Sequence, residues 1–321
     1  MAQYFDVFNG DADGICALHQ LRLAEPCAAK LITGVKRDIS LLAQVKAAAG
    51  DKITVLDVAM SKNHEALIAL LEAGAHVRYF DHHMPSVIPR HPHLEAHIDT
   101  DTNVCTSLLV NRYLGGSQLI WAVVAAFGDN MVSAAYAAAA PLNLSDAQLD
   151  SLRSLGECIN YNGYGDALAD LFYPPAELYR IVHCYADPFE LISREPAYHV
   201  LRDGYAEDMA RAQAVAPIQV RTGGAVYLLP DAAWSRRISG VFGNRLATGH
   251  PGRAHAVLTH KPGGGYVVSV RAPQATRSGA DVLCSGFVTG GGRRGAAGIN
   301  HLPEAELEEF VNRFYKTFEN N

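Results

Sequence analysis

The sequence predicts a two-domain α/β protein, with helices on both faces of a parallel N-terminal sheet and a smaller α/β domain at the C-terminus. Strand-like and helix-like runs alternate through the first 130 residues, and a helical, Ala-rich stretch follows. The pattern changes again near residue 215. Alternating elements favour a parallel sheet, and 321 residues suit two domains. We therefore expect one domain at 1–190, a linker at 191–214 and a second domain at 215–321.

Short apolar runs mark the strands of the first domain, and helical patterns separate them. Pro26 ends the first helix, Asp38 is the expected N-cap of the second, and Gly74 closes the third. The expected strands are 4–8, 31–33, 53–56 and 76–80, and the expected helices are 14–23, 38–48 and 62–72.

The rest of the chain is predicted from the same signals. Residues 103–190 are expected to be helical, with breaks at Gly115–Gly116 and Pro174–Pro175. In the second domain we expect strands at 226–229, 255–259 and 266–270, helices at 238–246 and 304–318, and a glycine-rich loop within 286–298.

Composition excludes several classes of protein. Hydrophobic residues make up 49% of the chain, enough for real cores, but no run reaches eighteen apolar residues, so no membrane span is expected. The N-terminus has neither the basic nor the apolar segment of a secretory signal. Six scattered cysteines without a CxxC pair predict reduced thiols rather than disulfides or a zinc site. We expect a cytoplasmic protein.

Charge is distributed unevenly between the two halves. Residues 1–190 carry 22 acidic and 12 basic residues, whereas residues 215–301 carry 2 acidic and 10 basic residues. An acidic half suits a cation site, and a basic half suits a substrate that bears phosphate.

Acidic or imidazole groups follow three of the predicted strands. Asp11 and Asp13 lie in Asn-Gly-Asp-Ala-Asp-Gly after the first, Asp57 follows the third, and His82 and His83 follow the fourth. Ligands in parallel sheets bind at the carboxyl ends of the strands, so these groups are expected to converge. Any one motif alone would equally suit a turn. Together, oxygen and imidazole donors favour divalent ions such as manganese.

A further carboxylate is needed to complete two ion sites. The candidates are Asp99, Asp101 and Asp129, and we prefer Asp129 because it directly follows an apolar helical run. Two divalent ions would activate a water for in-line attack on a phosphate. Asp57 is the expected bridging carboxylate, and His83 is expected to contact the phosphate or protonate the leaving oxygen.

These motifs resemble those of the DHH phosphoesterases, whose name comes from the Asp81-His82-His83 motif. The runs NGDADG, VLD, FDHH and AFGDN match its four motifs in order, and VSVRAP…SGFVTGGGRRGAAGI resembles its C-terminal DHH-associated domain. The resemblance covers nearly the whole chain. It indicates the group that contains nano-RNases, RecJ-like exonucleases and dinucleotide hydrolases.

The resemblance implies a role for each matching residue. Asp11 and Asp13 would each bind one ion, Asp57 would bridge them, and His82 and Asp129 would complete the sphere of the ion at Asp13. His83 would contact the scissile phosphate. The second domain would hold the far part of the substrate across an interdomain cleft, through Arg271, Gly290, Gly291 and Gly292.

The sequence departs from the family pattern at two places. Val7 stands where many members carry a histidine ligand, which indicates a RecJ-like subgroup. Arg293 and Arg294 stand where the glycine loop normally carries a histidine. This pair is either a solvated basic pair or a grip on a terminal phosphate or a guanine edge.

A short substrate is favoured because the second domain has few candidate stacking residues. We expect a manganese-dependent hydrolase (magnesium or cobalt being alternatives) that cuts short oligonucleotides, above all dinucleotides such as pGpG, to mononucleotides. Alternatives are a phosphoadenosine phosphate, a cyclic dinucleotide or pyrophosphate as substrate, or a non-catalytic nucleotide sensor. The helical middle segment could form a homodimer surface. His91 and His93 have no expected role beyond an exposed loop.

Overall fold

The structure, a computed structural model, describes residues 2–319. The chain forms two compact units, Met1–Asp203 and Gly204–Asn321. The boundary falls within one continuous helix, α9 (Pro196–Ala214). The range 191–214, expected to be a linker, therefore contains α9 and the end of α8 (Pro188–Arg194).

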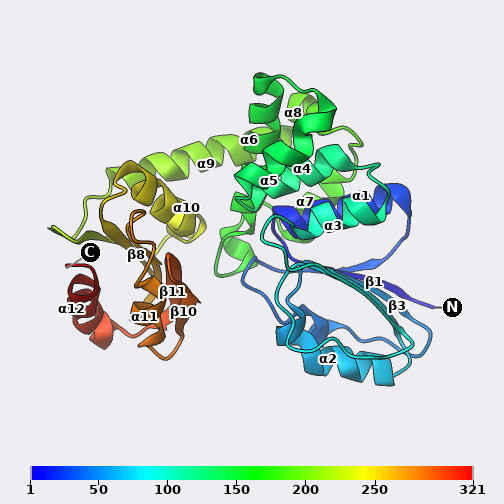
Figure 1. Ribbon diagram of the computed structural model, residues 1–321, viewed down its shortest axis with the longest axis horizontal. Helices are drawn as coiled ribbons and strands as arrows, with labels where there is room; N and C mark the ends of the chain where they lie inside the picture. Colours follow the sequence, from blue (N-terminus) through cyan, green and yellow to red (C-terminus); the bar gives the residue numbers. More distant parts are fainter. Residues whose placement is uncertain (1, 320–321) are drawn as a thin grey trace. The chain divides into compact units, whose positions relative to one another are not determined.

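The N-terminal unit is built on a five-stranded parallel sheet with the order β2-β1-β3-β4-β5. Its alternating side chains enter two cores, because successive residues of a strand face opposite sides of the sheet. Phe8 packs with α1, whereas Val7 packs with α2. Figure 1 shows α2 on one face of this sheet and α1 and α3 on the other. The strands are β1 (Tyr4–Phe8), β2 (Lys30–Ile32), β3 (Lys52–Leu56), β4 (His76–Asp81) and β5 (Leu94–Ile98).

The apolar helix α4 lies at the centre of the helical part of this unit. Every residue of α4 from Trp121 to Gly128 is buried, which agrees with its unbroken apolar sequence. Gly128 and Gly156 allow α4 and α6 to touch, since a Cβ on Gly156 would lie 2.1 Å from the carbonyl oxygen of Val124. The helices are α1 (Ala12–Ala24), α2 (Met60–Glu72), α3 (Thr106–Tyr113), α4 (Leu119–Gly128), α5 (Val132–Ala139), α6 (Asp146–Gly163), α7 (Pro175–Val182) and α8, with 3-10 turns at Leu41–Gln44, Ala140–Leu142 and Leu168–Asp170.

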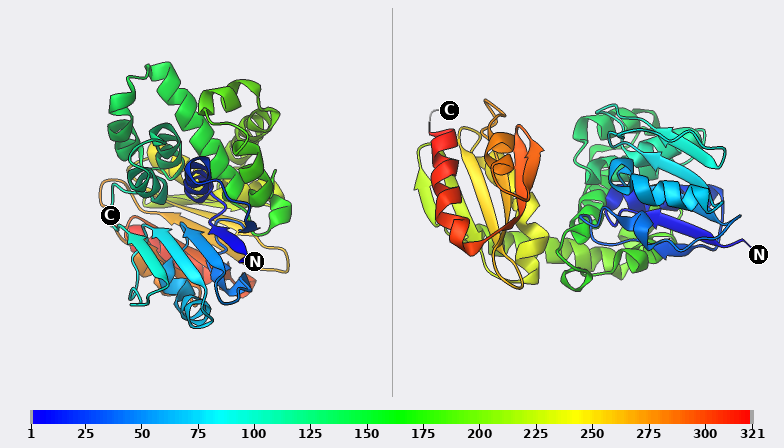
Figure 2. Two further views of the ribbon diagram at one scale, coloured as in Figure 1. Left: turned by 90° about the vertical axis from the view of Figure 1, so that its right-hand side faces the viewer. Right: turned by 90° about the horizontal axis from the view of Figure 1, so that it is seen from below.

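The C-terminal unit contains a six-stranded mixed sheet with the order β10-β11-β9-β8-β7-β6. Val226 faces the core that α11 and α12 cover, whereas the next residue, Tyr227, contacts Phe242 of α10 on the opposite face. Figure 2 shows α12, in red, against this sheet. The elements are β6 (Gln219–Arg221), β7 (Gly224–Leu229), α10 (Ala233–Gly249), β8 (Ala254–His260), β9 (Tyr266–Arg271), α11 (Ala280–Ser285), β10 (Gly290–Arg293), β11 (Ala296–Leu302), a 3-10 turn at Glu304–Glu306 and α12 (Leu307–Phe318).

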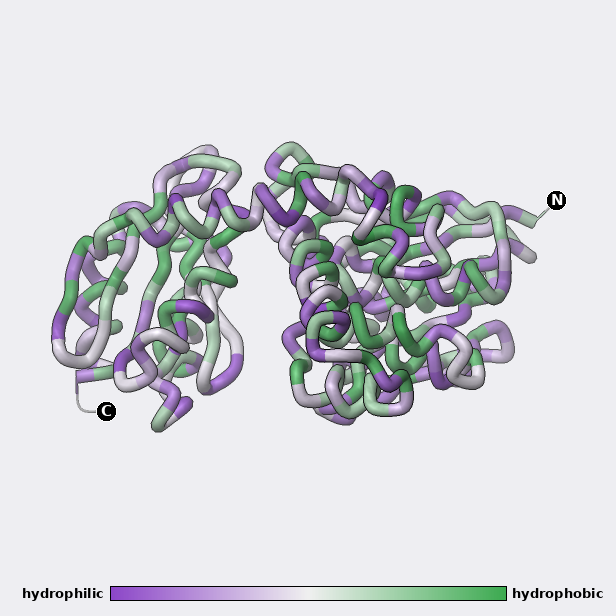
Figure 3. Tube along the Cα trace, turned by 90° about the horizontal axis from the view of Figure 1, so that it is seen from above, coloured by the Kyte–Doolittle hydropathy of each residue, from purple (hydrophilic) through white to green (hydrophobic). Residues whose placement is uncertain are grey.

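The predicted α/β class is confirmed: the N-terminal unit has a parallel sheet with helices on both faces, and the C-terminal unit is a second α/β fold. Figure 3 shows hydrophobic segments, in green, running through the interior of each unit. Within residues 2–319, no helix combines the length and apolar character needed to cross a membrane.

Two local predictions are wrong. Residues 38–48 form only a short 3-10 turn, because Asn63 of α2 bonds to the backbone of Ile39 and Leu42 and so replaces the partners that a helix would use. The glycine-rich segment is not a loop. Gly290, Gly291 and Gly292, expected in a loop, lie in strand β10, where Gly292 pairs with Ala297 of β11.

Candidate metal centre

Three strand ends of the N-terminal sheet deliver the predicted motifs to one pocket of about 130 Å³. Asp11 caps α1 directly after β1, and its Oδ1 atom accepts hydrogen bonds from the N–H groups of Asp13 and Gly14. Asp57 follows β3, and His82 follows β4. The parallel strands end at one edge of the sheet, so residues distant in sequence become neighbours.

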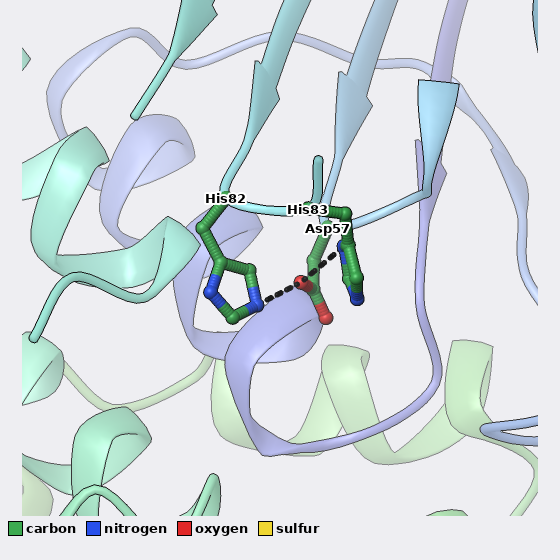
Figure 4. Close-up of side chains that lie close together, drawn as sticks. All are labelled: Asp57, His82 and His83. Carbon is green, nitrogen blue, oxygen red and sulfur yellow. Dashed lines mark ion pairs between the residues drawn. The ribbon is translucent and has the colours of Figure 1, made fainter. Parts of the chain in front are cut away.

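Asp57 lies at the middle of this group. It is 3% exposed and has a left-handed backbone with φ of 57°, a conformation that costs energy for a residue with a side chain. Its Oδ1 atom lies 3.5 Å from Nε2 of His82 and 4.0 Å from Nδ1 of His83. Figure 4 shows both imidazole rings beside the Asp57 carboxylate. Strain at this position is consistent with a functional role for the carboxylate.

His82 is oriented to act as a ligand. Its Nδ1 atom lies 3.0 Å from the carbonyl oxygen of Val104, which can only accept, so Nδ1 carries a proton and Nε2 is the ring nitrogen left to bind an ion. A ligand histidine usually has such a partner on its other nitrogen. Ligand atoms of His82, Asp13 and Asp129 all lie within 4.8 Å of one another, and those of His82, Asp57 and His83 form a second such group.

His83 is held by the first residue of its own motif. Its Nδ1 atom lies 2.6 Å from Oδ1 of Asp81, which also accepts from the N–H groups of His82 and His83. The hydrogen bond to Asp81 raises the pKa of His83 above its usual value, although burial opposes the shift. The ring is 43% exposed, so His83 can hold a proton on Nε2 and still reach a ligand.

Negative charge accumulates where these carboxylates meet. Burial raises the pKa of Asp57 well above its usual range, and the charges of Asp13, Asp11 and Asp129 raise it further. Burial and the charges of Asp13 and Asp11 also raise the pKa of Asp129, although Lys36 opposes the shift. Burial would also raise the pKa of Asp11, but the ammonium group of Lys36 reverses the shift and lowers it. The cluster therefore favours cations.

Lys36 was missed in the sequence. Its Nζ atom lies 2.6 Å from Oδ2 of Asp11 and 3.5 Å from Oδ1 of Asp129. It belongs to the charged Lys36-Arg37-Asp38 triplet that follows strand β2. The strand-end rule that identified Asp57 would have identified this triplet as well.

Thr106 and Ser107, at the start of α3, were also missed. Their N–H groups donate to Oδ2 and Oδ1 of Asp13, both at 2.7 Å. The hydroxyl of Thr106 donates to Oδ1 of Asp57 at 3.1 Å. Helix N-termini favour carboxylates, so α3 fixes the orientation of two acidic side chains at once. Nothing in the local spacing signals this contact.

The other predicted substrate residues belong to the C-terminal unit. Arg271 ends β9, where its guanidinium bonds to Asn244, Ser269 and two backbone carbonyls. Ala296 pairs with Arg271 on one side and with Arg293 on the other, so both arginines project from the same face of the sheet.

The glycines of this hairpin differ in their surroundings. A Cβ on Gly291 would meet nothing within 4 Å, whereas one on Gly290 or Gly292 would collide with neighbouring atoms. Gly291 pairs with Gly298, and the backbone is uncovered at Gly291, whereas a Cβ on Gly298 would lie 2.7 Å from the carbonyl oxygen of Val268. Arg294 follows β10, and its side chain is exposed.

The residues left without a role have structural explanations. Asp99 accepts hydrogen bonds from the N–H of Asp101 and from Arg112, and Asp101 accepts from the N–H of Asn103. These bonds order the turn before α3, as expected for short acidic side chains.

His91 and His93 lie in the segment that leads into β5. The ring of His93 packs against the ring of His76, with centroids 4.2 Å apart. The backbone N–H of His93 donates to Nδ1 of His91.

A divalent ion fits the donor set of the pocket. The carboxylates of Asp11, Asp57 and Asp129 line one small pocket together with His82. A carboxylate oxygen of the buried Asp13 lies within 4.8 Å of ligand atoms of His82 and Asp129. Mixed oxygen and imidazole donors of this kind suit manganese and similar ions.

No protein-family model and no curated protein matches the chain. Solved structures do. A DHH-domain protein described as a member of a family of ribosomal proteins has a TM-score of 0.64 at 14% identity, covering 98% of this chain and 86% of its own. The exonuclease RecJ bound to manganese has a TM-score of 0.60 at 18% identity, with coverage of 97% and 89%.

A pGpG-specific phosphodiesterase, PggH from Vibrio cholerae, matches over nearly the full length of both chains. It has a TM-score of 0.59 at 15% identity and covers 99% of each chain. At these identities the likeness establishes the fold, which is that of the DHH-domain proteins.

Proposed function

We propose that this chain, which has the fold of the DHH-domain proteins, is a divalent-metal-dependent phosphodiesterase that hydrolyses short linear oligonucleotides to mononucleotides. The observation that carries the proposal is that Asp11, Asp57, His82 and Asp129 line one pocket, with Asp13 grouped beside His82 and Asp129. Dinucleotides such as pGpG are the proposed preferred substrates. The similar solved structures include an exonuclease and a pGpG-specific phosphodiesterase, which supports this substrate class.

The five residues would hold two divalent ions, with manganese the proposed metal. Asp57 is the proposed shared ligand because its Oδ1 atom lies 3.5 Å from Nε2 of His82 and its carboxylate lines the same pocket as Asp11. Bound divalent ions supply Lewis acidity, which activates a water molecule and offsets the charge on the phosphoryl oxygens.

The protein groups around the ions have separate tasks. The bond from Nδ1 of His82 to Val104 orients the ring so that Nε2 is the nitrogen that would bind an ion, and Thr106 fixes the direction of the Asp57 carboxylate. His83, held by Asp81, carries a proton that it can give to the leaving oxygen or share with a phosphate oxygen. The partial exposure of His83 leaves room for the substrate.

The C-terminal unit is the proposed holder of the rest of the substrate. Arg271 and Arg293 project from one face of the sheet, and the uncovered backbone at Gly291 allows close approach of a ligand. Arginine binds a phosphate or a guanine edge through two parallel hydrogen bonds. This arrangement supports a preference for guanine-containing dinucleotides, with Arg294 as a further contact.

The test is hydrolysis of a substrate panel with manganese. The panel contains pGpG, pApA, pCpC, a longer RNA, a cyclic dinucleotide, phosphoadenosine phosphate and pyrophosphate. We expect release of mononucleotides, fastest from pGpG, and loss of activity in Asp57→Asn. Asparagine is the chosen replacement because it removes the charge of Asp57 yet tolerates the left-handed backbone at this position.

Two outcomes would change the proposal. Equal turnover of all three dinucleotides, or an Arg293→Ala effect that is the same for each, would remove the guanine preference. A protein that binds manganese but turns over nothing in the panel would be a nucleotide-binding protein rather than a hydrolase.

A further inference from the structure

The ammonium group of Lys36 lies among the proposed metal ligands. Its Nζ atom is 2.6 Å from Oδ2 of Asp11 and 3.5 Å from Oδ1 of Asp129, and its side chain is 27% exposed. The other oxygen of Asp11, Oδ1, is engaged by the N–H groups of Asp13 and Gly14. An ion that binds Asp11 through Oδ2 must therefore displace the ammonium group of Lys36 from that oxygen.

The position of Lys36 is fixed by packing rather than by chance contact at the surface. Its N–H donates to the carbonyl oxygen of Gly163 at 2.8 Å, at the end of α6. Asn9 donates to the carbonyl oxygen of Lys36 at 3.4 Å. A Cβ on Gly10 would lie only 2.0 Å from the carbonyl oxygen of Gly34, so the two loops touch directly. The loop thus delivers the ammonium group to Asp11.

The two groups of potential ligands differ in their relation to Lys36. Asp13, His82 and Asp129 have ligand atoms within 4.8 Å of one another, and this group does not need Asp11. The ammonium group is 3.5 Å from Asp129 but only 2.6 Å from Asp11, so a first ion can bind this group while Lys36 stays on Asp11. The second group consists of Asp57, His82 and His83. A second ion held there would complete its sphere with Asp11, which lines the same pocket, and would meet the ammonium group at that carboxylate. Two cations cannot share Oδ2 of Asp11 at close range without strong repulsion.

We propose that Lys36 competes with the second divalent ion for Asp11, so that the two ions bind in order and with unequal affinity. The proposal rests on the proposed two-ion function of the same pocket. Lys36 has other partners when it leaves Asp11. Its Nζ atom lies 3.0 Å from Oδ1 of Asn160 and 5.5 Å from the centre of the Tyr164 ring. These two groups offer the ammonium group partners other than Asp11.

The test is a manganese titration of the wild-type protein and Lys36→Met, followed by calorimetry and by the electron paramagnetic resonance of bound manganese. We expect two steps in the wild type, the second at least tenfold weaker than the first. Lys36→Met, which keeps the length but not the charge, should tighten the second step at least fivefold more than the first. The spectrum of a coupled ion pair should then appear at lower manganese.

Two further variants separate this effect from general charge or folding effects. Arg37→Met removes the neighbouring charge, which is paired with Asp166, and should leave the ratio of the two steps unchanged. Lys36→Gln repeats the test with a polar side chain in case Lys36→Met folds poorly. Circular dichroism of each variant without metal checks the fold.

The outcomes distinguish this inference from the proposed function. If the wild type hydrolyses dinucleotides but Lys36→Met and Lys36→Gln leave the ratio of the two steps unchanged, or weaken the second step, Lys36 does not compete for Asp11 and the function stands. If the wild type binds no manganese and hydrolyses nothing, the proposed function fails, and the competition fails with it.

Discussion

The hydroxyl group of Thr106 donates a hydrogen bond to Oδ1 of Asp57 at 3.1 Å, while the N–H of the same residue donates to Asp13 at 2.7 Å. One residue of α3 thereby orients two proposed metal ligands. Groups that orient ligands in this way commonly affect metal affinity nearly as much as the ligands do.

Replacing Thr106 by valine should weaken manganese binding by roughly 10- to 100-fold, because the branched shape stays but the donor to Asp57 is lost. Calorimetric titration with manganese measures the change. Thr106→Ser keeps the hydroxyl and should remain within about threefold of the wild type, well inside the range for a lost partner. Equal affinity of the wild type and Thr106→Val would show that this hydrogen bond does not support the metal centre.

A buried ion pair outside the pocket should govern the stability of the N-terminal unit. Nε of Arg22 lies 2.9 Å from Asp6, and the two side chains are 7% and 2% exposed. Asp6→Ala leaves the guanidinium buried with Thr54 as its remaining side-chain partner. We expect a loss of about 3–5 kcal/mol in the free energy of unfolding, measured with urea.

The control for this prediction is an exposed pair in the same unit. Arg153 and Glu157 are 44% and 38% exposed, so Arg153→Ala should cost less than about 1 kcal/mol. Similar losses in Asp6→Ala and Arg153→Ala would argue against a special contribution from the buried pair.

Much of the pocket could be predicted because its residues obey a rule that is visible in the sequence. Asp57 and His82 each follow an apolar strand, and the strands of a parallel sheet end at a common edge. Asp129 follows the apolar helix α4 and reaches the same pocket. In each case a local pattern fixes both the element and the position of the polar residue after it.

The parts that could not be predicted depend on contacts between distant segments. Thr106 reaches Asp13 only because α3 packs against α1, and no spacing in the sequence encodes that packing. The failure at 38–48 has the same origin, since Asn63 takes over the backbone of that segment. Tertiary contacts of this kind override local propensity.

Acid should destabilise the protein through His19. Burial and, to a smaller extent, the neighbouring His183, whose Nδ1 lies 3.1 Å from Nδ1 of His19, lower the pKa of His19 to about 3. The unfolded chain binds this proton near pH 6.5 and the folded chain near pH 3. Between these values the unfolded chain holds one proton more than the folded chain. The free energy of unfolding is therefore undiminished by His19 above pH 6.5, and it falls by at most about 1.4 kcal/mol per pH unit as the pH drops toward 3.

Urea unfolding at several pH values between 6.5 and 4 tests the contribution of His19. His19→Gln cannot take up a proton, so its free energy of unfolding should fall less steeply with pH than that of the wild type. The exposed His199 provides the control, because His199→Gln should keep the wild-type slope. A slope that is unaffected by His19→Gln would assign the acid sensitivity to other groups.

Adjacent glycines of β10 should separate stability from substrate binding. A Cβ on Gly290 would lie 1.7 Å from the carbonyl oxygen of Cys284, so Gly290→Ala must push β10 away from α11 and should cost about 1–3 kcal/mol in thermal or urea unfolding. A Cβ on Gly291 meets nothing within 4 Å, so Gly291→Ala should leave stability within about 0.5 kcal/mol of the wild type. If a dinucleotide approaches the uncovered backbone at Gly291, the same variant, Gly291→Ala, should raise KM several-fold with kcat little changed. Unaltered KM and stability in Gly291→Ala would place the substrate elsewhere on the C-terminal unit.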